Sequence, residues 1–420
     1  MSFQQGLSGL NATNKHLEII GHNIANANTF GAKASRAEFA DMYSAAIGGA
    51  GSSIIGIGVN LQTVAQQFTQ GNISTTENPM DLAINGGGFF QMTDERNPIS
   101  YTRNGQFKVN RDGFIVNNSG LKLMGYQADS NGVVQPGTAN PVQLPTVGIS
   151  PKPTSLIDLE ANLDSRKAIT APASGAAIDY LDPRTFNNAT SMTMYDDKGQ
   201  DIAVTMFFQK SANDTWNLFA TANGVSVGGT NVAPTALATL TFAANGSAIL
   251  TPPMPMLVNI PATTNAEGAL TLPMTGVKFD LVNSTQYGSP YGVTDMAQDG
   301  FAAGQLNTVS IEQDGLIMAR YSNGQTKPAG QLEMATFRNP QGLLPLGNNL
   351  WGLTNAAGDA VLGTPGQGVL GVLQAGALEE SNVDLTGELV AMITAQRTYQ
   401  ANAQTIKTMD QVLQTLVNLR

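Results

Sequence analysis

Large apolar residues recur at seven-residue spacing at both ends of the chain. At the start they are Phe3, Leu10, Leu17 and Ile24; at the end they are Leu385, Met392, Tyr399, Ile406 and Leu413. This spacing is typical of one stripe along a coiled-coil helix. It predicts a helix over residues 1–27 and a second over 385–420, capped by Asp384. We call the two stripes the apolar lanes; to bury them, the helices need each other or neighbouring copies of the chain.

We expect these lanes and the apolar residues beside them to form an assembly seam. Small or polar residues such as Gln396, Asn402 and Asp410 flank the second lane, and so narrow a stripe suits a seam better than docking on a β domain. Each glycine inside the first helix costs up to about 1 kcal/mol, so we expect this helix to be ordered only when packed. The predicted seam residues are Phe3, Leu7, Leu10, Leu17, Ile20, Ile24, Leu385, Leu389, Met392, Tyr399, Ile406, Leu413 and Leu416.

The pattern changes between the helices. Residues 28–70 mix Gly, Ala and Ser with isolated apolar residues and no sustained period, which predicts an extended or short-hairpin connector. Its expected flexible part is rich in glycine. These glycines are Gly48, Gly49, Gly51, Gly56 and Gly58.

Turn signals between alternating segments predict β structure from residue 71 onward. Residues 71–145 carry Asn104-Gly105 and Asp112-Gly113, and residues after about 290 carry Asp314-Gly315 and Asn323-Gly324. Because these two stretches share their chemistry, we interpret them as halves of one β domain. Residues 146–290, with turn signals at 196–199 and 223–224, are then an inserted β domain.

Composition excludes several classes of protein. Charged residues make up 12% of the 420 residues, about half the usual share of roughly 25%. The net charge of −10 argues against nucleic-acid binding, which needs basic surfaces. The absence of cysteine excludes disulfides, thiolate catalysis and cysteine zinc sites. The first ten residues lack the features of a cleavable secretory signal, and no apolar run is long enough to span a bilayer, so we expect neither.

No residue constellation predicts catalysis, a cofactor or a metal. His16 and His22 are six residues apart, whereas a metal pair on one helix face needs a spacing of three or four. Gly86, Gly87 and Gly88 lack the lysine and the following helix of a phosphate loop. The Asp-rich turns near residues 129 and 196 lack the glutamate that closes a calcium loop. We therefore expect a protein that is not an enzyme.

Two long motifs resemble a known family. LSGLNATNKHLEIIGHNIANANTFGAKASRAEF resembles the N-terminal signature of bacterial flagellar axial proteins, the rod and hook family, and ESNVDLTGELVAMITAQRTYQANAQTIKTMDQVL resembles its C-terminal signature. INGGGFFQM and YSNGQTKPAGQLEMATFRNPQGL resemble the first β domain of the hook members. The resemblance covers nearly the whole chain outside residues 146–290.

The resemblance implies the fold as well. It implies a mainly β protein with α-helical termini, in which the N- and C-terminal helices pair as a coiled coil, followed outward by a split β domain and an inserted outer β domain. The expected ranges are 1–27 and 382–420 for the inner helical coiled-coil domain, 28–70 and 366–381 for extended connector segments, 71–145 and 291–365 for the split middle β domain, and 146–290 for the inserted outer β domain.

The function implied by the resemblance is structural. It is that of a hook subunit that self-assembles into a flexible curved tube with a central export channel, a universal joint that transmits motor torque from rod to filament. The implied location is extracellular, in the flagellum and continuous with its basal body. Export without a cleaved signal peptide is implied, and Phe3 and Leu7 match the family's export-gate pattern.

The implied partners are further copies of the chain, the distal rod protein, the hook cap, the hook–filament junction proteins and the type III flagellar export apparatus. No nucleic acid, membrane span or cofactor is expected. One alternative is a distal rod subunit, which has no comparable inserted domain. Another is a β-rich secreted adhesin, which would share the acidic, Thr- and Asn-rich composition without needing the apolar lanes.

Overall fold

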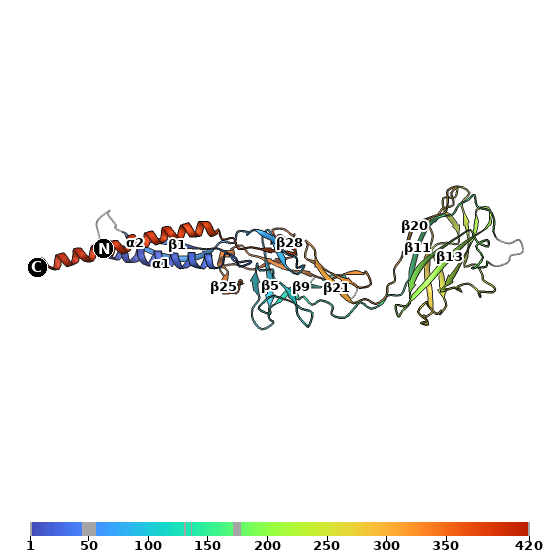
Figure 1. Cartoon of the computed structure of the whole chain (residues 1–420), viewed down its shortest axis with the longest axis horizontal. Helices are drawn as coiled ribbons and strands as arrows, with labels where there is room; N and C mark the ends of the chain where they lie inside the picture. The colour runs from blue at the N-terminus through green and yellow to red at the C-terminus, as the bar shows by residue number, and fades with distance from the viewer. Residues whose placement is uncertain (1, 44–55, 130–131, 136, 171–177, 419–420) are drawn as a thin grey trace. The chain divides into compact units, whose positions relative to one another are not determined.

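The computed structural model describes residues 2–43, 56–129, 132–135, 137–170 and 178–418 (Figure 1). The chain folds into two compact units. Unit 1 comprises Met1–Thr146, Thr308–Arg320 and Thr326–Arg420, and unit 2 comprises Val147–Asn307 and Tyr321–Gln325. Unit 2 is therefore inserted between two parts of unit 1, as the sequence predicted for the fold class.

Both predicted terminal helices are present in unit 1. Helix α1 spans Ser2–Ala25 and helix α2 spans Leu385–Asn418. Asp384 caps α2 as expected, because its Oδ1 accepts a hydrogen bond from the Thr386 N–H at 3.1 Å. The two helices lie side by side (Figure 1), and together with strands β1 and β2 we call them the helix–hairpin module.

Of the extended or short-hairpin connector predicted over residues 28–70, the central part forms a hairpin, but a long one. Strands β1 (Ser35–Tyr43) and β2 (Gly56–Gln66) form a long antiparallel hairpin, with Ser35 opposite Gln66, Tyr43 opposite Gly56 and two register shifts between these pairs. Gly56 and Gly58 are therefore part of a strand and not of a flexible connector. Gly48, Gly49 and Gly51 lie outside the described residues.

Gly58 has a packing role instead. Its φ of +137° favours glycine, and a Cβ at this position would lie 2.0 Å from Ser8 Oγ. The missing side chain therefore lets β2 lie directly against α1.

The split β domain is a thirteen-stranded sheet to which both halves of the sequence contribute. Strand β5 pairs with β24, β6 with β26 and β9 with β23, so strands from before unit 2 are flanked in one sheet by strands from after it. The strands are β5 (Phe89–Thr93), β6 (Ser100–Thr102), β7 (Lys108–Val109), β8 (Ile115–Val116), β9 (Lys122–Gln127), β10 (Asn140–Pro141), β21 (Leu306–Ile311), β22 (Leu316–Tyr321), β23 (Thr326–Leu332), β24 (Met334–Thr336), β25 (Leu344–Gly347), β26 (Leu350–Gly352) and β27 (Val361–Gly363).

Two small sheets lie between the module and this sheet in the sequence. Strand β3 (Ile73–Thr75) pairs with β29 (Ala377–Glu379), and β4 (Leu82–Asn85) pairs with β28 (Val372–Ala375). The expected connector over 366–381 thus contains two strands. A 3-10 turn, η1, covers Pro340–Gly342.

Aromatic side chains form a core of unit 1. Phe89 and Tyr101 come from before the insertion and Phe337 and Trp351 from after it, and all four are buried in one cluster. Phe68, which follows β2, packs against Phe89 and Trp351 with ring centroids 5.5 Å apart in both cases. The core therefore also anchors the segment that leads in from the module.

Most predicted turns of the split β domain are confirmed. Asp112-Gly113 joins β7 to β8, and Asn323-Gly324 joins β22 to β23. The hairpin predicted at Asn104-Gly105 is wrong, because β6 pairs with β5 and β26, whereas β7 pairs with β8. Here the chain makes a tight bend in which the Gln106 N–H donates to Asn104 Oδ1 at 3.0 Å.

Unit 2 is a sandwich of two sheets. The six-stranded sheet contains β12 (Asn188–Tyr195), β13 (Asp201–Ala212), β14 (Thr215–Ala222), β15 (Val225–Ser226), β16 (Ala238–Phe242) and β17 (Ile249–Thr251). The four-stranded sheet contains β11 (Leu156–Asn162), β18 (Met256–Ile260), β19 (Met274–Asp280) and β20 (Gly292–Gln298). Because β20 pairs with β11, the inserted β structure extends beyond the expected end at residue 290.

The two sheets of unit 2 share one apolar core. Leu159 and Phe279 from the smaller sheet and Phe208 and Trp216 from the larger one belong to a single buried cluster. The Trp216 Nε1–H donates to Gln286 Oε1 at 3.1 Å, so its polar edge is satisfied inside the core.

The chain enters and leaves unit 2 through two paired segments, residues 149–156 and 298–304, which we call the neck. Ile149 is bridged to Gly304 and Lys152 to Phe301. Asp299 accepts hydrogen bonds from the N–H groups of Ser155 and Leu156 at 2.7 and 2.9 Å and from Lys152 Nζ at 2.9 Å. The neck is therefore held by side-chain as well as backbone bonds.

Candidate assembly interface

Helices α1 and α2 pair in antiparallel orientation. A Cβ at Gly6 would meet Ile406, a Cβ at Gly9 would meet Asn402, and Asn23 at the other end of α1 bonds to Glu388. Residue numbers thus rise along α1 as they fall along α2.

The contact between the two helices rests on small residues that the sequence analysis did not assign to it. A Cβ at Gly9 would lie 2.9 Å from Asn402 Nδ2, and one at Gly6 would lie 3.1 Å from Ile406 Cγ1. Ala395 is almost fully buried at the same interface, beside Thr13. The sequence signal was the three-residue spacing of Gly6 and Gly9, which puts both on one helix face. Their absent side chains allow α2 to come close.

Asn23 fixes the end of the helix pair nearest the β sheets. Its Nδ2 donates to Glu388 Oε1 and to the Ser35 carbonyl, both at 2.8 Å, and its Oδ1 accepts from the Ser35 N–H at 2.8 Å. The side chain is almost fully buried. One asparagine therefore joins α1, α2 and β1 in a single register.

The predicted seam residues divide into two groups in the single chain. Those buried or half-buried are Leu10, Leu17, Ile20, Ile24, Met392 and Ile406. Those exposed are Phe3, Leu7, Leu385, Leu389, Tyr399 and Leu413; the side chain of Leu416 lies outside the described residues. Contacts within one chain therefore account for half of the predicted seam.

Exposure alternates along the second lane. Met392 and Ile406 are half-buried, whereas Leu385, Tyr399 and Leu413 are exposed. A straight helix drifts by about 20° per heptad relative to a seven-residue repeat, so a lane with this spacing does not stay on one face. Seven-residue spacing predicted the helix correctly, but not which of its positions face α1.

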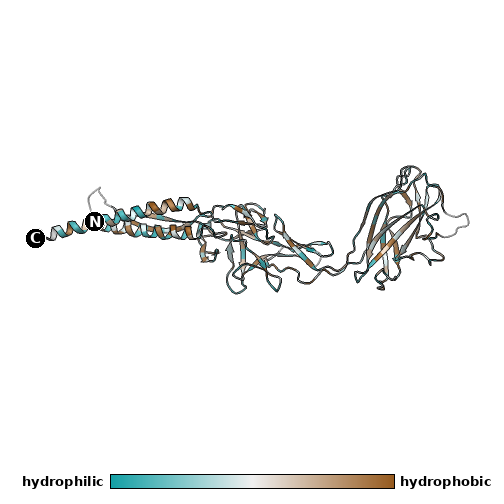
Figure 2. Cartoon of the chain, viewed as in Figure 1, coloured by the Kyte–Doolittle hydropathy of each residue, from teal (hydrophilic) through white to brown (hydrophobic). Residues whose placement is uncertain are grey.

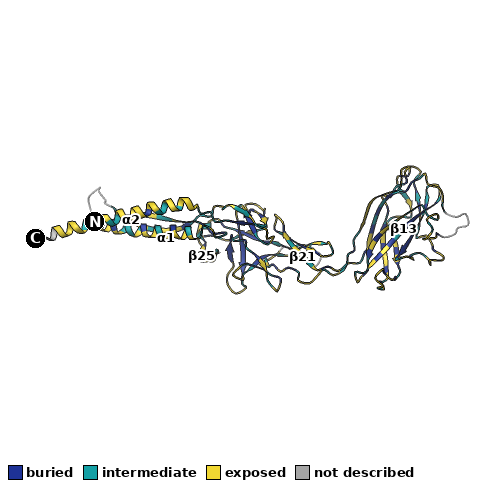
Figure 3. Ribbon diagram, viewed as in Figure 1, coloured by how far each residue is buried: buried dark blue, intermediate teal, exposed yellow. Residues whose placement is uncertain are grey.

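The first half of α2 is apolar on its outer side as well. Leu385, Leu389, Val390 and Ile393 are all exposed, Val390 to 60%. The same stretch of α2 is brown in the hydropathy view of Figure 2 and yellow in the burial view of Figure 3. Phe3 and Leu7 of α1 are exposed at the opposite end of the helix pair, so each end carries an uncovered apolar surface.

Helix α2 also extends beyond the start of α1 (Figure 1). With Ile406 opposite Gly6, the last two turns of α2 have no counterpart on α1. Leu413 lies there with 55% of its surface exposed, although its lane faces α1 one heptad earlier. The apolar face of α2 thus runs past the partner that its own chain provides.

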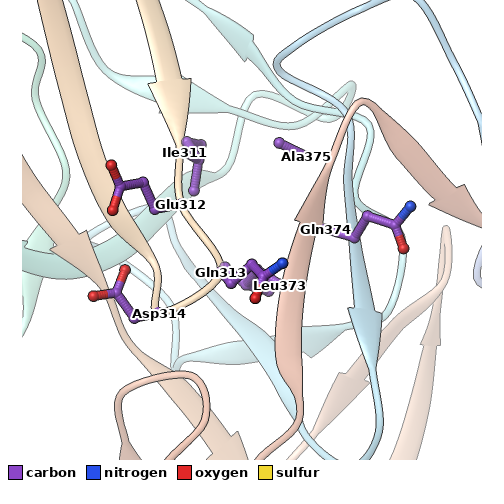
Figure 4. Close-up of a pocket in the computed structure, with 7 residues that line it drawn as sticks. All are labelled: Ile311, Glu312, Gln313, Asp314, Leu373, Gln374 and Ala375. Atoms are coloured by element: carbon purple, nitrogen blue, oxygen red, sulfur yellow. The ribbon is translucent and has the colours of Figure 1, made fainter.

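One groove of unit 1 is lined by acidic, amide and apolar side chains. This groove of about 570 Å³ is lined by Ile311, Glu312, Gln313, Asp314, Leu373, Gln374 and Ala375 (Figure 4). Its Glu312 and Asp314 come from the turn after β21 and its Gln374 from β28, and none of its lining residues is a histidine or a hydroxyl nucleophile. Across the described part of the chain, no three His, Asp or Glu side chains gather where they could hold a metal ion.

The histidines show no shared site either. His16 contacts the ring of Phe39 edge-on at 6.1 Å, and His22 lines a different groove beside Trp351. Among the described helices, none combines the length and hydropathy of a membrane span.

Four family profiles match successive parts of the chain. They are described as flagella basal body rod protein (residues 3–33), flagellar hook protein FlgE/F/G D1 domain (83–173), flagellar basal body protein FlaE D2 domain (162–301) and flagellar basal body rod FlgEFG protein C-terminal (374–419).

Three full-length relatives are named flagellar hook protein FlgE. The chain is 38% identical to the flagellar hook protein FlgE of Escherichia coli K12 and 37% identical to that of Salmonella typhimurium LT2, each over 100% of both chains. It is 31% identical to the FlgE of Borreliella burgdorferi over 100% of this chain and 99% of the relative. The crystal structure of Helicobacter pylori flagellar hook protein FlgE2 shares the fold, with a TM-score of 0.50 at 14% identity, covering 73% of this chain and 100% of that chain.

A chain with these terminal helices, this split β sheet and this inserted sandwich is thus more than 30% identical, over its full length, to proteins named flagellar hook protein FlgE. The distal-rod alternative is not favoured by these matches. The chain belongs to the flagellar hook protein family.

Proposed function

We propose that this chain is a structural subunit of the flagellar hook that assembles into a tube through its helix pair. The observation that carries the proposal is the uncovered apolar surface of α1 and α2. Phe3, Leu385 and Ile393 are each at least 44% exposed although they belong to long, well-formed helices. Groups of exposed apolar side chains mark sites of protein association, and neighbouring copies of the same helix pair supply matching faces.

In the proposed tube the helix pairs form the inner wall around an export channel. The split β sheet then forms a middle layer and unit 2 an outer layer. This division is supported by the helix pair, whose apolar lanes give the inner wall strong contacts, and by unit 2, whose two sheets bury their apolar core between them. Stiff inner and weaker outer contacts are what a universal joint needs, since it transmits torque while it bends.

An edge strand of unit 2 supports weak outer contacts. The side chains of β20 are exposed on nearly its whole length, and Asp295 Oδ1 accepts a hydrogen bond from the Met296 N–H at 2.8 Å. A charged side chain that occupies an edge N–H opposes permanent strand pairing with another copy. Neighbouring copies of unit 2 then slide past each other without locking.

The proposal extends to location and partners. The chain leaves the cell through the type III flagellar export apparatus, with Phe3 and Leu7 as its export-gate pattern, and works outside the cell without enzymatic activity. At the ends of the tube it contacts the distal rod protein, the hook cap and the hook–filament junction proteins. The exposure of Phe3 and Leu7 in the folded chain, 46% and 45%, is compatible with such recognition.

Electron microscopy of the purified chain under polymerising conditions tests the proposal. We expect the full chain to form tubes with a central channel, and the chain lacking residues 1–27 to form none while its two β units remain folded. Fluorescence of buried Trp216 and Trp351 reports on that folding. Absence of tubes from the full chain, or equal tubes from the shortened chain, would contradict the proposal.

A further inference from the structure

Three charged side chains are buried together where the helix–hairpin module joins the sheets of unit 1. Lys33 follows α1, Arg103 follows β6 and Glu379 ends β29. The side chains of Lys33 and Glu379 are 0% exposed and that of Arg103 is 4% exposed. We call them the junction cluster. Burying charges is costly unless their hydrogen bonds are satisfied, so the contacts decide what the cluster does.

Glu379 contacts three separate segments of the chain. Its Oε1 accepts from Lys33 Nζ at 2.6 Å and from the Gly71 N–H at 2.9 Å, and its Oε2 accepts from Arg103 Nη1 at 3.1 Å. Its backbone carbonyl accepts from the Gly31 N–H at 2.8 Å. One residue thus joins the loop after α1, the segment after β2 and the loop after β6.

Each cation makes a second bond to another segment. Lys33 Nζ donates to the Thr69 carbonyl at 2.8 Å, and Arg103 Nη2 donates to the Gly86 carbonyl at 2.8 Å. The Arg103 guanidinium also lies over the Phe89 ring, 5.4 Å from its centroid. Through Phe89 the cluster is continuous with the aromatic core of unit 1.

The charges of the cluster depend on Glu379. Burial lowers the pKa of Lys33 and the pKa of Arg103 below their ordinary values, and the nearby Glu379 carboxylate acts in the opposite direction on both. Arg103 lowers the pKa of Lys33 further, because the two cations repel each other. Both ion pairs of these cations are made with Glu379, so its removal leaves two buried cations facing each other.

The backbone segments around the cluster are closely packed and leave no room for a side chain at Gly31 or Gly71. Gly31 has a φ of +71°, and a Cβ there would lie 2.6 Å from the Asn104 backbone nitrogen. A Cβ at Gly71 would lie 2.0 Å from the Glu380 carbonyl oxygen. Asn382, just before α2, donates to the Gln67 carbonyl at 2.7 Å. The chain passes twice between the helix–hairpin module and the sheets of unit 1, near residues 67–72 and 380–384. These two segments are therefore hydrogen-bonded to each other.

We propose that Glu379 is a positioning residue that fixes the helix–hairpin module to the sheets of unit 1, so that torque crosses this junction without bending it. The inference rests on the proposed function, since torque matters only in an assembled hook. Bending of the tube then takes place in contacts between copies or in other parts of the chain.

Two variants of the full chain test this role. Glu379→Gln keeps the shape but leaves the two cations unpaired. The triple variant Lys33→Met, Arg103→Met, Glu379→Leu removes all three charges, and apolar replacement of a buried ionic triad generally preserves folding. Glu38→Gln is the matched control, because it breaks the exposed ion pair between Glu38 and Arg36 on β1.

Hydrogen exchange in the purified chain gives the first measurement. We expect the Gly31 and Gly71 amides to exchange at least ten-fold faster in both the Glu379→Gln and the triple variant, with the strand amides of β13 unchanged, and no change in the Glu38→Gln control. Unchanged protection of Gly31 and Gly71 in the triple variant would overturn the proposal even if Glu379→Gln fails to fold.

Flagellar rotation gives the second measurement. In cells whose own hook gene is deleted and replaced by these variants, we expect the triple variant to build tubes of normal number that rotate a tethered cell more slowly than the wild-type chain does. Equal rotation rates would overturn the proposed role of Glu379. Failure of the wild-type chain itself to build tubes would instead contradict the proposed function, whatever the exchange of Gly31 and Gly71.

Discussion

Gly9 and Gly21 lie on the same helix but in different surroundings. A Cβ at Gly9 would come within 2.9 Å of Asn402, whereas a Cβ at Gly21 would meet nothing within 4 Å. The first glycine is needed for the approach of α2, and the second only lowers helix propensity. Comparing these two residues therefore distinguishes the packing role of a glycine from its cost in helix stability.

Replacing Gly9 by Leu should weaken the helix pair. Overpacking of a close contact costs roughly 1–3 kcal/mol, which exceeds the gain of up to about 1 kcal/mol from helix propensity. We expect Gly9→Leu to reduce tube formation and Gly21→Leu to leave it unchanged or improved, measured by sedimentation of polymer. Equal yields from the two variants would show that α2 does not depend on this close approach.

Replacing Ile406 by Asp should abolish assembly while both β units stay folded. Ile406 contacts α1 at Gly6, and an unpaired carboxylate in this apolar contact costs on the order of several kcal/mol. Gln404→Asp, on the exposed side of α2, is the control and should assemble normally. Electron microscopy and tryptophan fluorescence check the two parts of this prediction. Normal tubes from Ile406→Asp would mean that the contact is not buried in the assembly.

At the scale of elements, periodicity predicted the helices better than their contacts. The seven-residue spacing predicted both helices, and Asp384 predicted the start of α2. The spacing did not reveal that Gly6, Gly9 and Asn402 form the contact, because a large apolar residue gives a stronger pattern than an absent side chain. For residues 28–70 the sequence predicted at most a short hairpin and not the long strands β1 and β2, because the apolar residues there have no sustained alternation.

The sequence pattern does not predict polar contacts between residues that are far apart in the chain. Lys33, Arg103 and Glu379 are far apart in the chain, and each looks like an isolated surface charge. Their burial follows from the fold, which pairs β3 with β29 and brings the loop after α1 to both. By contrast, the Asp112-Gly113 and Asn323-Gly324 turns were predictable because their chemistry is local.

The neck of unit 2 should be sensitive to acid. Burial alone would raise the pKa of Asp299, but hydrogen bonds from Lys152, Ser155 and Leu156 outweigh it and hold the pKa well below its ordinary value of 3.8. A carboxyl group whose pKa is lower in the folded state contributes stability at neutral pH and loses it as the pH falls through the folded value. We therefore expect the stability of unit 2 to decline below about pH 4.

Thermal unfolding of the full chain with Trp351→Phe, so that Trp216 alone reports on unit 2, measures this decline. Asp299→Asn should lower the midpoint at pH 7 and make its dependence on pH between 5 and 2 shallower. Asp158→Asn is the control of opposite sign: burial and the neighbouring Asp280, Glu160 and Asp295 raise the pKa of Asp158, so neutralising it should raise the midpoint at pH 7. The same acid slope in Asp299→Asn and wild type would exclude the neck as its source.

At the scale of the whole molecule, deleting unit 2 should impair bending of the tube without preventing its assembly. Ile149 and Gly304 are antiparallel bridge partners, so a two-residue Asn-Gly turn can replace residues 150–303. We expect this shortened chain to form tubes through its helix pair, but straight or stiff ones, seen by electron microscopy. The same deletion with Ile406→Asp is the control and should form none. Loss of all polymerisation in the deletion alone would refute this division of labour.

The central claim is that the apolar surface of the helix pair is completed by neighbouring copies at the inner wall of a tube. Helical reconstruction of the assembled tube by electron microscopy tests it most directly. The account predicts that α1 and α2 lie at the smallest radius and that Leu385, Ile393 and Leu413, all exposed in the single chain, are covered by other copies. Helices at the outer surface, or these three side chains still facing solvent in the tube, would contradict it.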